Sequence, residues 1–244
     1  MNSNIKTTQT SPQIYARIGG VLYLIIIAAG IFGELFVRGK LIVSGDPTAT
    51  ANNIMNSPLL WRTGIAGDLI MHVCDIPLIL IFYVLLKPVN KNLALLALLF
   101  TMIQTAVLVA TKLNLFTPLI LLENVGNLKA FEPYQLHSLI YFSIKLDANG
   151  FGIGLIFFGL ACIVNGYLIF RSTYLPKTLG VLMQIAGLCY LINSFSMILV
   201  PAFFNMISPT ILAPAFIGEL SLCIWLLMKG VNLTKWELKQ LIIQ

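Results

Sequence analysis

Three ionisable side chains lie close together in an otherwise apolar stretch of this sequence. Asp68, His72 and Asp75 occupy positions i, i+4 and i+7 of the segment RTGIAGDLIMHVCDIPL. If that segment is helical, all three lie on one face of the helix. Two carboxyl groups and an imidazole on one face can exchange protons, bind a cation or supply ligands to a metal ion. These residues are therefore the first candidates for chemistry.

Other ionisable residues fall at similar depths in neighbouring apolar segments. A charged group in hydrocarbon costs about 2.5–3.5 kcal/mol on insertion, so each needs a partner, water or a neutral form. We expect the acidic members to be nearly balanced by the basic ones, with Lys145 and a protonated His72 contributing. The spacing predicts one polar cluster in the non-cytoplasmic half of the membrane, made of Glu34, Arg62, Asp68, His72, Asp75, Lys112, Asp147 and Glu219.

Several roles are open to such a cluster. The leading hypothesis is an outward-facing polar cavity that binds a small or protonatable ligand, with Asp68, His72, Asp75 and Glu219 at its core. The same charges could instead only fix helix packing. The first three residues also offer a metal-binding face, with Glu219 as a fourth ligand, and haem ligation by His72 and His137 is a weaker hypothesis. The sequence specifies no cofactor.

Three protein classes remain open beside a ligand-binding protein: a membrane-embedded enzyme, a transporter and a structural or partner subunit. An enzyme would use the carboxyl groups and the imidazole for acid–base or metal chemistry, but the sequence contains no complete pairing of nucleophile and base. A transporter is expected to show repeat symmetry or broken helices, and neither is evident in the sequence. The class of activity therefore stays undecided from the sequence.

The composition indicates an all-α polytopic membrane protein. Of the 244 residues, 58% are hydrophobic and 10% are charged, whereas roughly 25% are charged in an ordinary soluble domain. The apolar runs last for about twenty residues, as in a transmembrane helix, and do not alternate as barrel strands do. We therefore expect six spans, at about residues 17–37, 61–86, 92–115, 145–170, 178–200 and 211–228.

The predicted organisation has three parts. Residues 1–16 form a cytoplasmic tail, residues 17–230 a single transmembrane domain, and residues 231–244 an amphipathic interfacial helix. Short helical segments are also expected outside the bilayer at Asp46-Pro47 and Glu132-Pro133, where a capping residue precedes Pro at the first helical position. If the second of these helices runs without interruption into the fourth span, it projects beyond the bilayer.

The positions of the basic residues predict the orientation. The net charge is +6, but Lys and Arg gather at helix ends, where they set topology and contact anionic lipid. We therefore expect the lipid bilayer as partner and no nucleic acid, with both termini in the cytoplasm and the protein in the cell membrane; the oligomeric state is not predicted. The predicted cytoplasmic side carries Lys6, Arg17, Lys87, Lys91, Arg171, Lys177, Lys229, Lys235 and Lys239, against Arg38, Lys40, Arg62 and Lys129 on the other side.

Four stretches, in order along the chain, resemble a known family. They are RIGGVLYLIIIAAGIFGELFVRGKLIVSGDPTATANNI (17–54), DLIMHVCDIPLILIFYVLLKPVN (68–90), GLIFFGLACIVNGYLIFRSTYLPKTLGVL (154–182) and IGELSLCIWLLMKGV (217–231). They are similar to the bacterial domain-of-unknown-function family 4386. The resemblance implies a multispanning membrane protein and carries no established activity. Family members often have His after the FFGL segment, where this chain has Ala161, so any metal or haem role of that His would be lost here.

Overall fold

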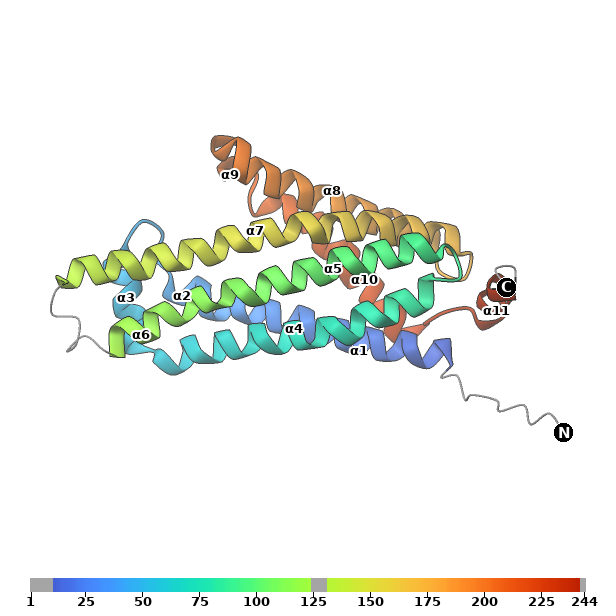
Figure 1. Cartoon of the computed structure of the whole chain (residues 1–244), viewed down its shortest axis with the longest axis horizontal. Helices are drawn as coiled ribbons and strands as arrows, with labels where there is room; N and C mark the ends of the chain where they lie inside the picture. The colour runs from blue at the N-terminus through green and yellow to red at the C-terminus, as the bar shows by residue number, and fades with distance from the viewer. Residues whose placement is uncertain (1–10, 124–130, 242–244) are drawn as a thin grey trace.

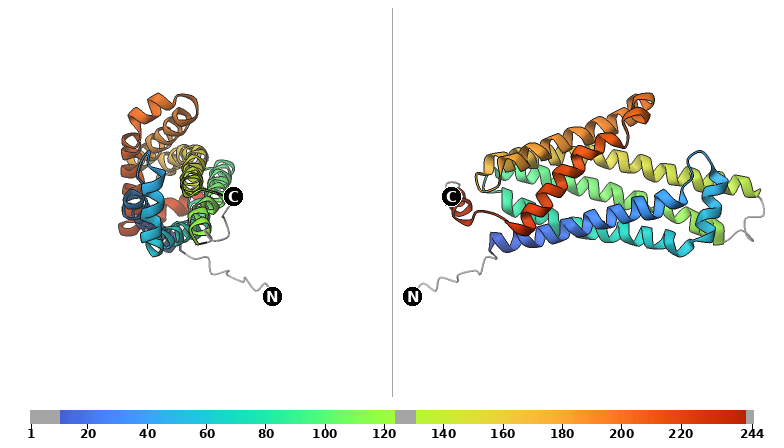
Figure 2. Two further views of the ribbon diagram at one scale, coloured as in Figure 1. Left: turned by 90° about the vertical axis from the view of Figure 1, so that its left-hand side faces the viewer. Right: turned by 180° about the vertical axis from the view of Figure 1, so that it is seen from behind.

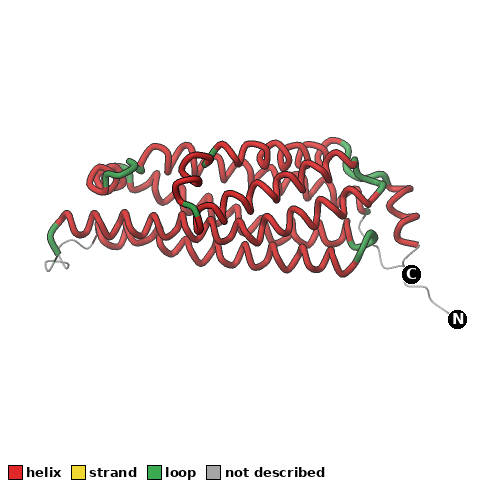
Figure 3. Tube along the Cα trace, turned by 90° about the horizontal axis from the view of Figure 1, so that it is seen from above, coloured by secondary structure: helices red, strands yellow, loops and turns green. Residues whose placement is uncertain are grey.

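The structure of the chain is a computed structural model that describes residues 11–123 and 131–241. Within these ranges every regular element is a helix, and the described part of the chain contains no strand (Figure 3). The predicted all-α class is confirmed. Lys6, Lys129, the rest of residues 1–10 and the last three residues of the chain lie outside the described residues.

Within the described residues, six helical stretches are long and apolar enough to cross a membrane, which confirms the predicted number of spans. The first begins at Pro12, five residues earlier than predicted, because Ser11 caps it and Pro suits the first helical position. The stretches are α1 (Pro12–Ile31) with η1 (Phe32–Arg38) and α2 (Gly39–Leu41); α4 (Pro58–Leu86); α5 (Lys91–Thr111) with η2 (Lys112–Phe116) and α6 (Thr117–Glu123); α7 (Pro133–Ser172); α8 (Lys177–Leu199); and η4 (Thr210–Leu212) with α10 (Ala213–Met228).

Three shorter helices lie outside these stretches: α3 (Pro47–Asn56), α9 (Pro201–Ile207) and α11 (Leu233–Leu241). The predicted start of α3 is confirmed, because Asp46 Oδ1 accepts a hydrogen bond from the Ala49 N–H at 2.9 Å. The predicted helix start at Glu132-Pro133 is confirmed as well. A reciprocal capping box between Glu132 and Gln135 starts α7, which then continues without a break into the fourth span.

The helices form an elongated bundle with two distinct ends (Figure 1). The start of α1, the short α4–α5 and α7–α8 connections and α11 lie at one end, which we call the terminal end. The opposite end, which we call the distal end, holds α3, α6 and the start of α7. With 40 residues, α7 is about 60 Å long, twice the thickness of a hydrocarbon core of about 30 Å. The distal end therefore extends beyond a bilayer that covers the terminal end.

The helices α8, α9 and α10 form a shorter arm on one side of the bundle. Its tip at α9 stops well before the distal end, and α10 runs obliquely back from that tip toward the start of α1 (Figure 2). In this path α10 packs against α8 and α1. Because the arm is short, α10 contributes side chains to the half of the bundle near the terminal end.

Among the described residues, two large hydrophobic cores succeed each other along the bundle, beside a small third cluster of Ala186, Cys189 and Ala215. The first lies toward the terminal end and includes Tyr23, Met183 and Leu222. The second lies toward the distal end and is centred on Trp61, which is 1% exposed and donates its indole N–H to the Leu115 carbonyl at 2.8 Å. Between the two cores, α4 and α7 carry buried charged residues. The apolar interior is therefore interrupted at one level.

Glycines allow α7 and α8 to pack backbone to backbone. Gly159 and Gly166 of α7 face Gly187 and Gly180 of α8. A Cβ added at Gly180 would lie 2.6 Å from the Gly166 carbonyl oxygen, closer than real Cβ atoms come. Small residues at such positions let membrane helices approach closely and gain van der Waals contact. This pair of helices therefore depends on the absence of side chains at these positions.

The amphipathic helix α11 is held against the terminal end by Trp236. The indole is buried, and its Nε1–H donates to the Leu85 carbonyl at 3.2 Å. The Tyr174 hydroxyl donates to the same carbonyl at 2.6 Å. That carbonyl lies in the last turn of α4, where helix carbonyls lack donors within the helix. The C-terminal helix and the α7–α8 connection thus share one anchoring point.

Candidate functional site

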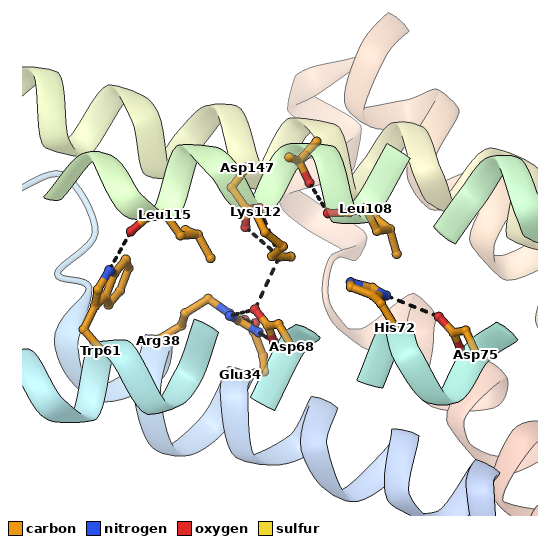
Figure 4. Close-up of polar contacts among 11 residues, drawn as sticks. Glu34, Arg38, Trp61, Asp68, His72, Asp75, Leu108, Lys112, Leu115 and Asp147 are labelled. Atoms are coloured by element: carbon orange, nitrogen blue, oxygen red, sulfur yellow. Dashed lines mark hydrogen bonds and ion pairs between the residues drawn. The ribbon is translucent and has the colours of Figure 1, made fainter. Parts of the chain in front are cut away.

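Asp68 lies at the centre of a buried ionic network between the two cores (Figure 4). Its carboxylate, 1% exposed, accepts hydrogen bonds from both terminal nitrogens of Arg38, at 2.7 and 3.2 Å. Lys112 Nζ lies 3.4 Å from the same carboxylate. A carboxylate that accepts two hydrogen bonds from one guanidinium group forms one of the strongest ion pairs found in proteins. Asp68 is therefore held as an ion by two cations from other helical segments.

Lys112 joins Asp68 to a second buried carboxylate. Its Nζ lies 3.0 and 3.1 Å from the two oxygens of Asp147 on α7. Both side chains are almost completely buried, whereas Glu34, which pairs with Arg38 Nε at 2.8 Å, is 70% exposed. The network, defined as Glu34, Arg38, Asp68, Lys112 and Asp147, therefore runs from an exposed carboxylate into the interior.

The backbone is not α-helical at three of the network residues. Glu34 and Arg38 lie on η1, a π-helical segment, and Lys112 opens the 3-10 segment η2. Gly33 sits directly beneath the network: a Cβ there would lie 2.8 Å from both a guanidinium nitrogen of Arg38 and a carboxylate oxygen of Asp68. Short π-helical segments occur frequently at functional sites. The first and third spans are thus irregular helices, which the sequence did not indicate.

The network lies near one boundary of a membrane that starts at the terminal end. Asp68 is 18 residues from the end of α4 and Asp147 is 25 residues from the end of α7, which correspond to about 27 and 38 Å. A hydrocarbon core is about 30 Å thick. In a bilayer that begins at the terminal end, the ion pairs would therefore lie near the opposite boundary.

His72 and Asp75 form a separate pair on the terminal side of the network. His72 Nδ1 lies 3.2 Å from Asp75 Oδ2, and the Thr105 hydroxyl donates to the same oxygen at 3.4 Å. The other ring nitrogen of His72 is buried and has no hydrogen-bond partner. Figure 4 shows the imidazole between Asp68 and Asp75. His72 is thus positioned between the ionic network and the next polar feature.

That next feature is a cavity of about 60 Å³ in the half of the bundle near the terminal end. Asp75 and Glu219 both line it, together with aromatic side chains that include Tyr23 and Phe158. Glu219 accepts a hydrogen bond from the Tyr190 hydroxyl. Among the described residues that line the cavity there is no Lys and no Arg. Two carboxyl groups therefore face a small cavity whose described lining contains no basic side chain.

The eight residues that were predicted to form one polar cluster lie in different places in the structure. Asp68, Lys112 and Asp147 are in the buried part of the network, and Glu34 is at its exposed edge. Arg62 is exposed on α4, and the guanidinium that pairs with Asp68 is that of Arg38. His72, Asp75 and Glu219 belong to the cavity side. Lys145, expected at the edge, lies over the ring of Tyr141 at 5.3 Å.

The depth predicted for Glu219 needs correction. The sequence placed Glu219 at the level of Asp68, because each span was counted as a straight crossing from its own distal start. The short, oblique path of α10 moves Glu219 toward the terminal end, where it lines the cavity with Asp75. Tyr23 and Asn165 line the same cavity.

The predicted metal face does not converge on one point. Asp68 is engaged by Arg38 and Lys112, whereas His72 and Asp75 pair with each other. Over residues 11–123 and 131–241 there is no group of three or more His, Cys, Asp or Glu side chains arranged to hold one metal ion. The arrangement suits proton exchange or binding of a monovalent cation better than it suits a transition metal.

Comparisons with known proteins identify a family and a relative of this chain. A family model described as Domain of unknown function (DUF4386) matches residues 18–230. An uncharacterized protein of Archaeoglobus fulgidus is 29% identical over 171 residues, which cover 70% of this chain and 86% of the relative. No solved structure matches the chain.

Proposed function

Because the chain belongs to the DUF4386 family and has six membrane-spanning helices, we propose that it is an integral membrane protein that binds a small cationic or protonatable ligand inside its bundle. The binding site is the cavity between Asp75 and Glu219. The observation that carries the proposal is the pair of carboxyl groups on a cavity whose described lining contains no basic side chain. Carboxyl groups in an apolar setting without a neighbouring Lys or Arg favour a cation or a proton.

The size and the walls of the cavity restrict the ligand. Its volume of about 60 Å³ is less than half of the roughly 150 Å³ that accommodates benzene in an engineered protein cavity. Aromatic rings surround the carboxyl groups: Tyr23 packs edge-on against Phe82 at 6.2 Å, and Phe158 against Tyr190 at 5.3 Å. Ring faces attract cations. Ions with few heavy atoms, such as sodium, potassium, ammonium and methylammonium, fit this description.

Thermal unfolding of the detergent-purified protein tests the proposal. We expect at least one of the four chloride salts to raise the melting temperature in a saturable manner, while choline chloride at equal ionic strength does not. A ligand at a hundred times its dissociation constant stabilises the folded protein by about 2.7 kcal/mol. Glu219→Gln and Asp75→Asn should each remove the effect. Glu237→Gln is the matched control, because Glu237 is exposed on α11.

The proposal fails if none of the four salts stabilises the parent more than choline chloride does. It also fails if both cavity variants fold and keep the full cation response. In that case Asp75 and Glu219 serve packing alone, which their hydrogen bonds to Thr105 and Tyr190 allow.

The proposed orientation places the terminal end in the cytoplasm and the bundle in the cell membrane. It rests on the basic residues at that end, among which Arg17, Lys87, Lys91, Arg171 and Lys177 lie at or near the ends of the spans. A phosphatase that is active only outside the cytoplasm should be inactive when it is fused after Gln244. The same enzyme inserted after Gly45, in the distal connection between α2 and α3, should be active. The reverse pattern would contradict the orientation.

A further inference from the structure

His72 links the two polar features of the bundle. Its imidazole is 2% exposed and lies one helical turn, about 6 Å along α4, from Asp68. On the other side its Nδ1 is 3.2 Å from Asp75, which lines the cavity. The ring therefore faces the ionic network with one nitrogen and the cavity with the other (Figure 4).

A purely structural role does not account for this ring. Its Nε2 is buried without a hydrogen-bond partner, and leaving a buried polar group unsatisfied costs about 1–3 kcal/mol. A residue that served packing alone would be more stable as an apolar side chain of similar size. Imidazole is, however, the side chain that can take up a proton on one nitrogen and give up a proton from the other.

We propose that His72 exchanges protons between the cavity and the distal side of the bundle, so that binding of a cation beside Asp75 releases a proton on the network side. This inference rests on the proposed function. It makes cation binding compete with protonation of Asp75, and it assigns the direction in which the displaced proton leaves.

One proton leaves His72 for each cation that binds. Without cation, Asp75 carries a proton that it donates to His72 Nδ1, and the proton of the neutral imidazole is on Nε2. When the cation binds, the O–H bond of Asp75 breaks, an N–H bond forms at Nδ1, and the Nε2–H bond breaks. The Nε2 proton leaves on the network side and reaches bulk solvent at the exposed edge of the network, at Glu34. One positive charge enters the site and one leaves, and the imidazole changes tautomer.

The charged groups around His72 favour proton uptake from the cavity side and proton release on the network side. On the network side, Arg38 and Lys112 hold Asp68 and Asp147 as ions, and the network opens to the surface at Glu34. On the cavity side, Asp75 and Glu219 lie close enough to interact electrostatically. Of these two carboxyl groups, Asp75 is the one that contacts His72, so we assign the proton exchange to Asp75.

The chain offers a direct spectroscopic test, because His72 and His137 are its only histidines. His137 is partly buried and its Nδ1 lies 3.3 Å from the Thr48 hydroxyl, so His137→Gln leaves His72 as the single imidazole. Nitrogen NMR of this variant with labelled histidine should show Nε2 protonated without cation and Nδ1 protonated with sodium, potassium, ammonium or methylammonium chloride. A tautomer that stays the same while a cation binds would overturn the proposal.

Measurement of proton release is the second test of the proposal. In weakly buffered detergent solution, a pH-indicating dye should report one proton released per cation bound by the parent. In His72→Gln, which keeps a hydrogen-bonding side chain beside Asp75, cation stabilisation should persist while release slows by about a hundredfold, the lower range of a positioned acid–base group. Equal release rates in the parent and in His72→Gln would refute the role of His72.

The inference can be separated from the proposed function. If no cation binds the parent, the proposed function fails, and the tautomer is then followed as the pH is raised. A change from Nε2–H to Nδ1–H in the His137→Gln protein, absent when Asp75→Asn is added, supports proton exchange between His72 and Asp75. An unchanged tautomer in the protein that retains Asp75 overturns it.

Discussion

Replacing Lys112 by Met is expected to lower the free energy of unfolding by about 3–5 kcal/mol, the range observed when one partner of a buried ion pair is removed. Lys112 is the cation within 3.1 Å of both oxygens of Asp147. Met fills a similar volume, so the loss comes from a buried carboxylate without its cation. Equilibrium unfolding of the purified protein in mixed detergent measures the change.

Two variants make this result specific. Lys145→Met is the matched control on α7, because Lys145 is exposed and stacks over Tyr141, and a change within about 1 kcal/mol is expected. The double variant Lys112→Met with Asp147→Asn removes both charges and should recover most of the loss. A double variant that is as unstable as Lys112→Met alone would show that the ion pair does not cause the effect.

Gly180→Ala is the second substitution with a large expected effect. A Cβ at this position meets the Gly166 carbonyl oxygen and the Phe170 nitrogen at 2.6 Å, and both atoms belong to the backbone of α7. Neither can turn away as a side chain does, so α7 and α8 must separate. Overpacking of this kind destabilises by about 1–3 kcal/mol, and we expect a value near 2 kcal/mol in the same unfolding experiment.

The control for this prediction is Gly67→Ala on α4. A Cβ there contacts only a ring carbon of Phe32 at 3.6 Å, an ordinary van der Waals distance. Since Ala favours a helix over Gly by up to about 1 kcal/mol, this variant should be as stable as the parent or more stable. If Gly180→Ala were equally well tolerated, the close approach of α7 and α8 would not contribute to stability.

The fold could be predicted from the sequence because its main signals are local. A run of about twenty apolar residues fixes a span, and the capping residues Asp46 and Glu132 fix two helix starts. The polar stripe of Asp68, His72 and Asp75 follows from helical periodicity alone. Each of these features depends on a few neighbouring residues, and the structure contains all of them.

The separation of the site into a network and a cavity could not be predicted, because it depends on where helices end and how they tilt. Arg38 was assigned to a loop, since the apolar run ends at Val37, although the helical stretch continues through η1 to Leu41. The i, i+4 spacing of Glu34 and Arg38 was the one available signal. The sequence predicts a position for Glu219 that is too close to the distal end, because the sequence of α10 does not show that this helix runs obliquely.

The order of the network residues along the chain bears on how the protein is made. All five belong to η1, α4, η2 and α7, so the ion pairs can close as soon as the fourth span has left the ribosome. Glu219 belongs to the last span and finds Tyr190 on the span before it. Because synthesis starts at the N-terminus, each buried charged residue enters a membrane that already contains its partner or that receives the partner shortly afterwards. Most of the electrostatic cost of insertion is removed before the chain is complete.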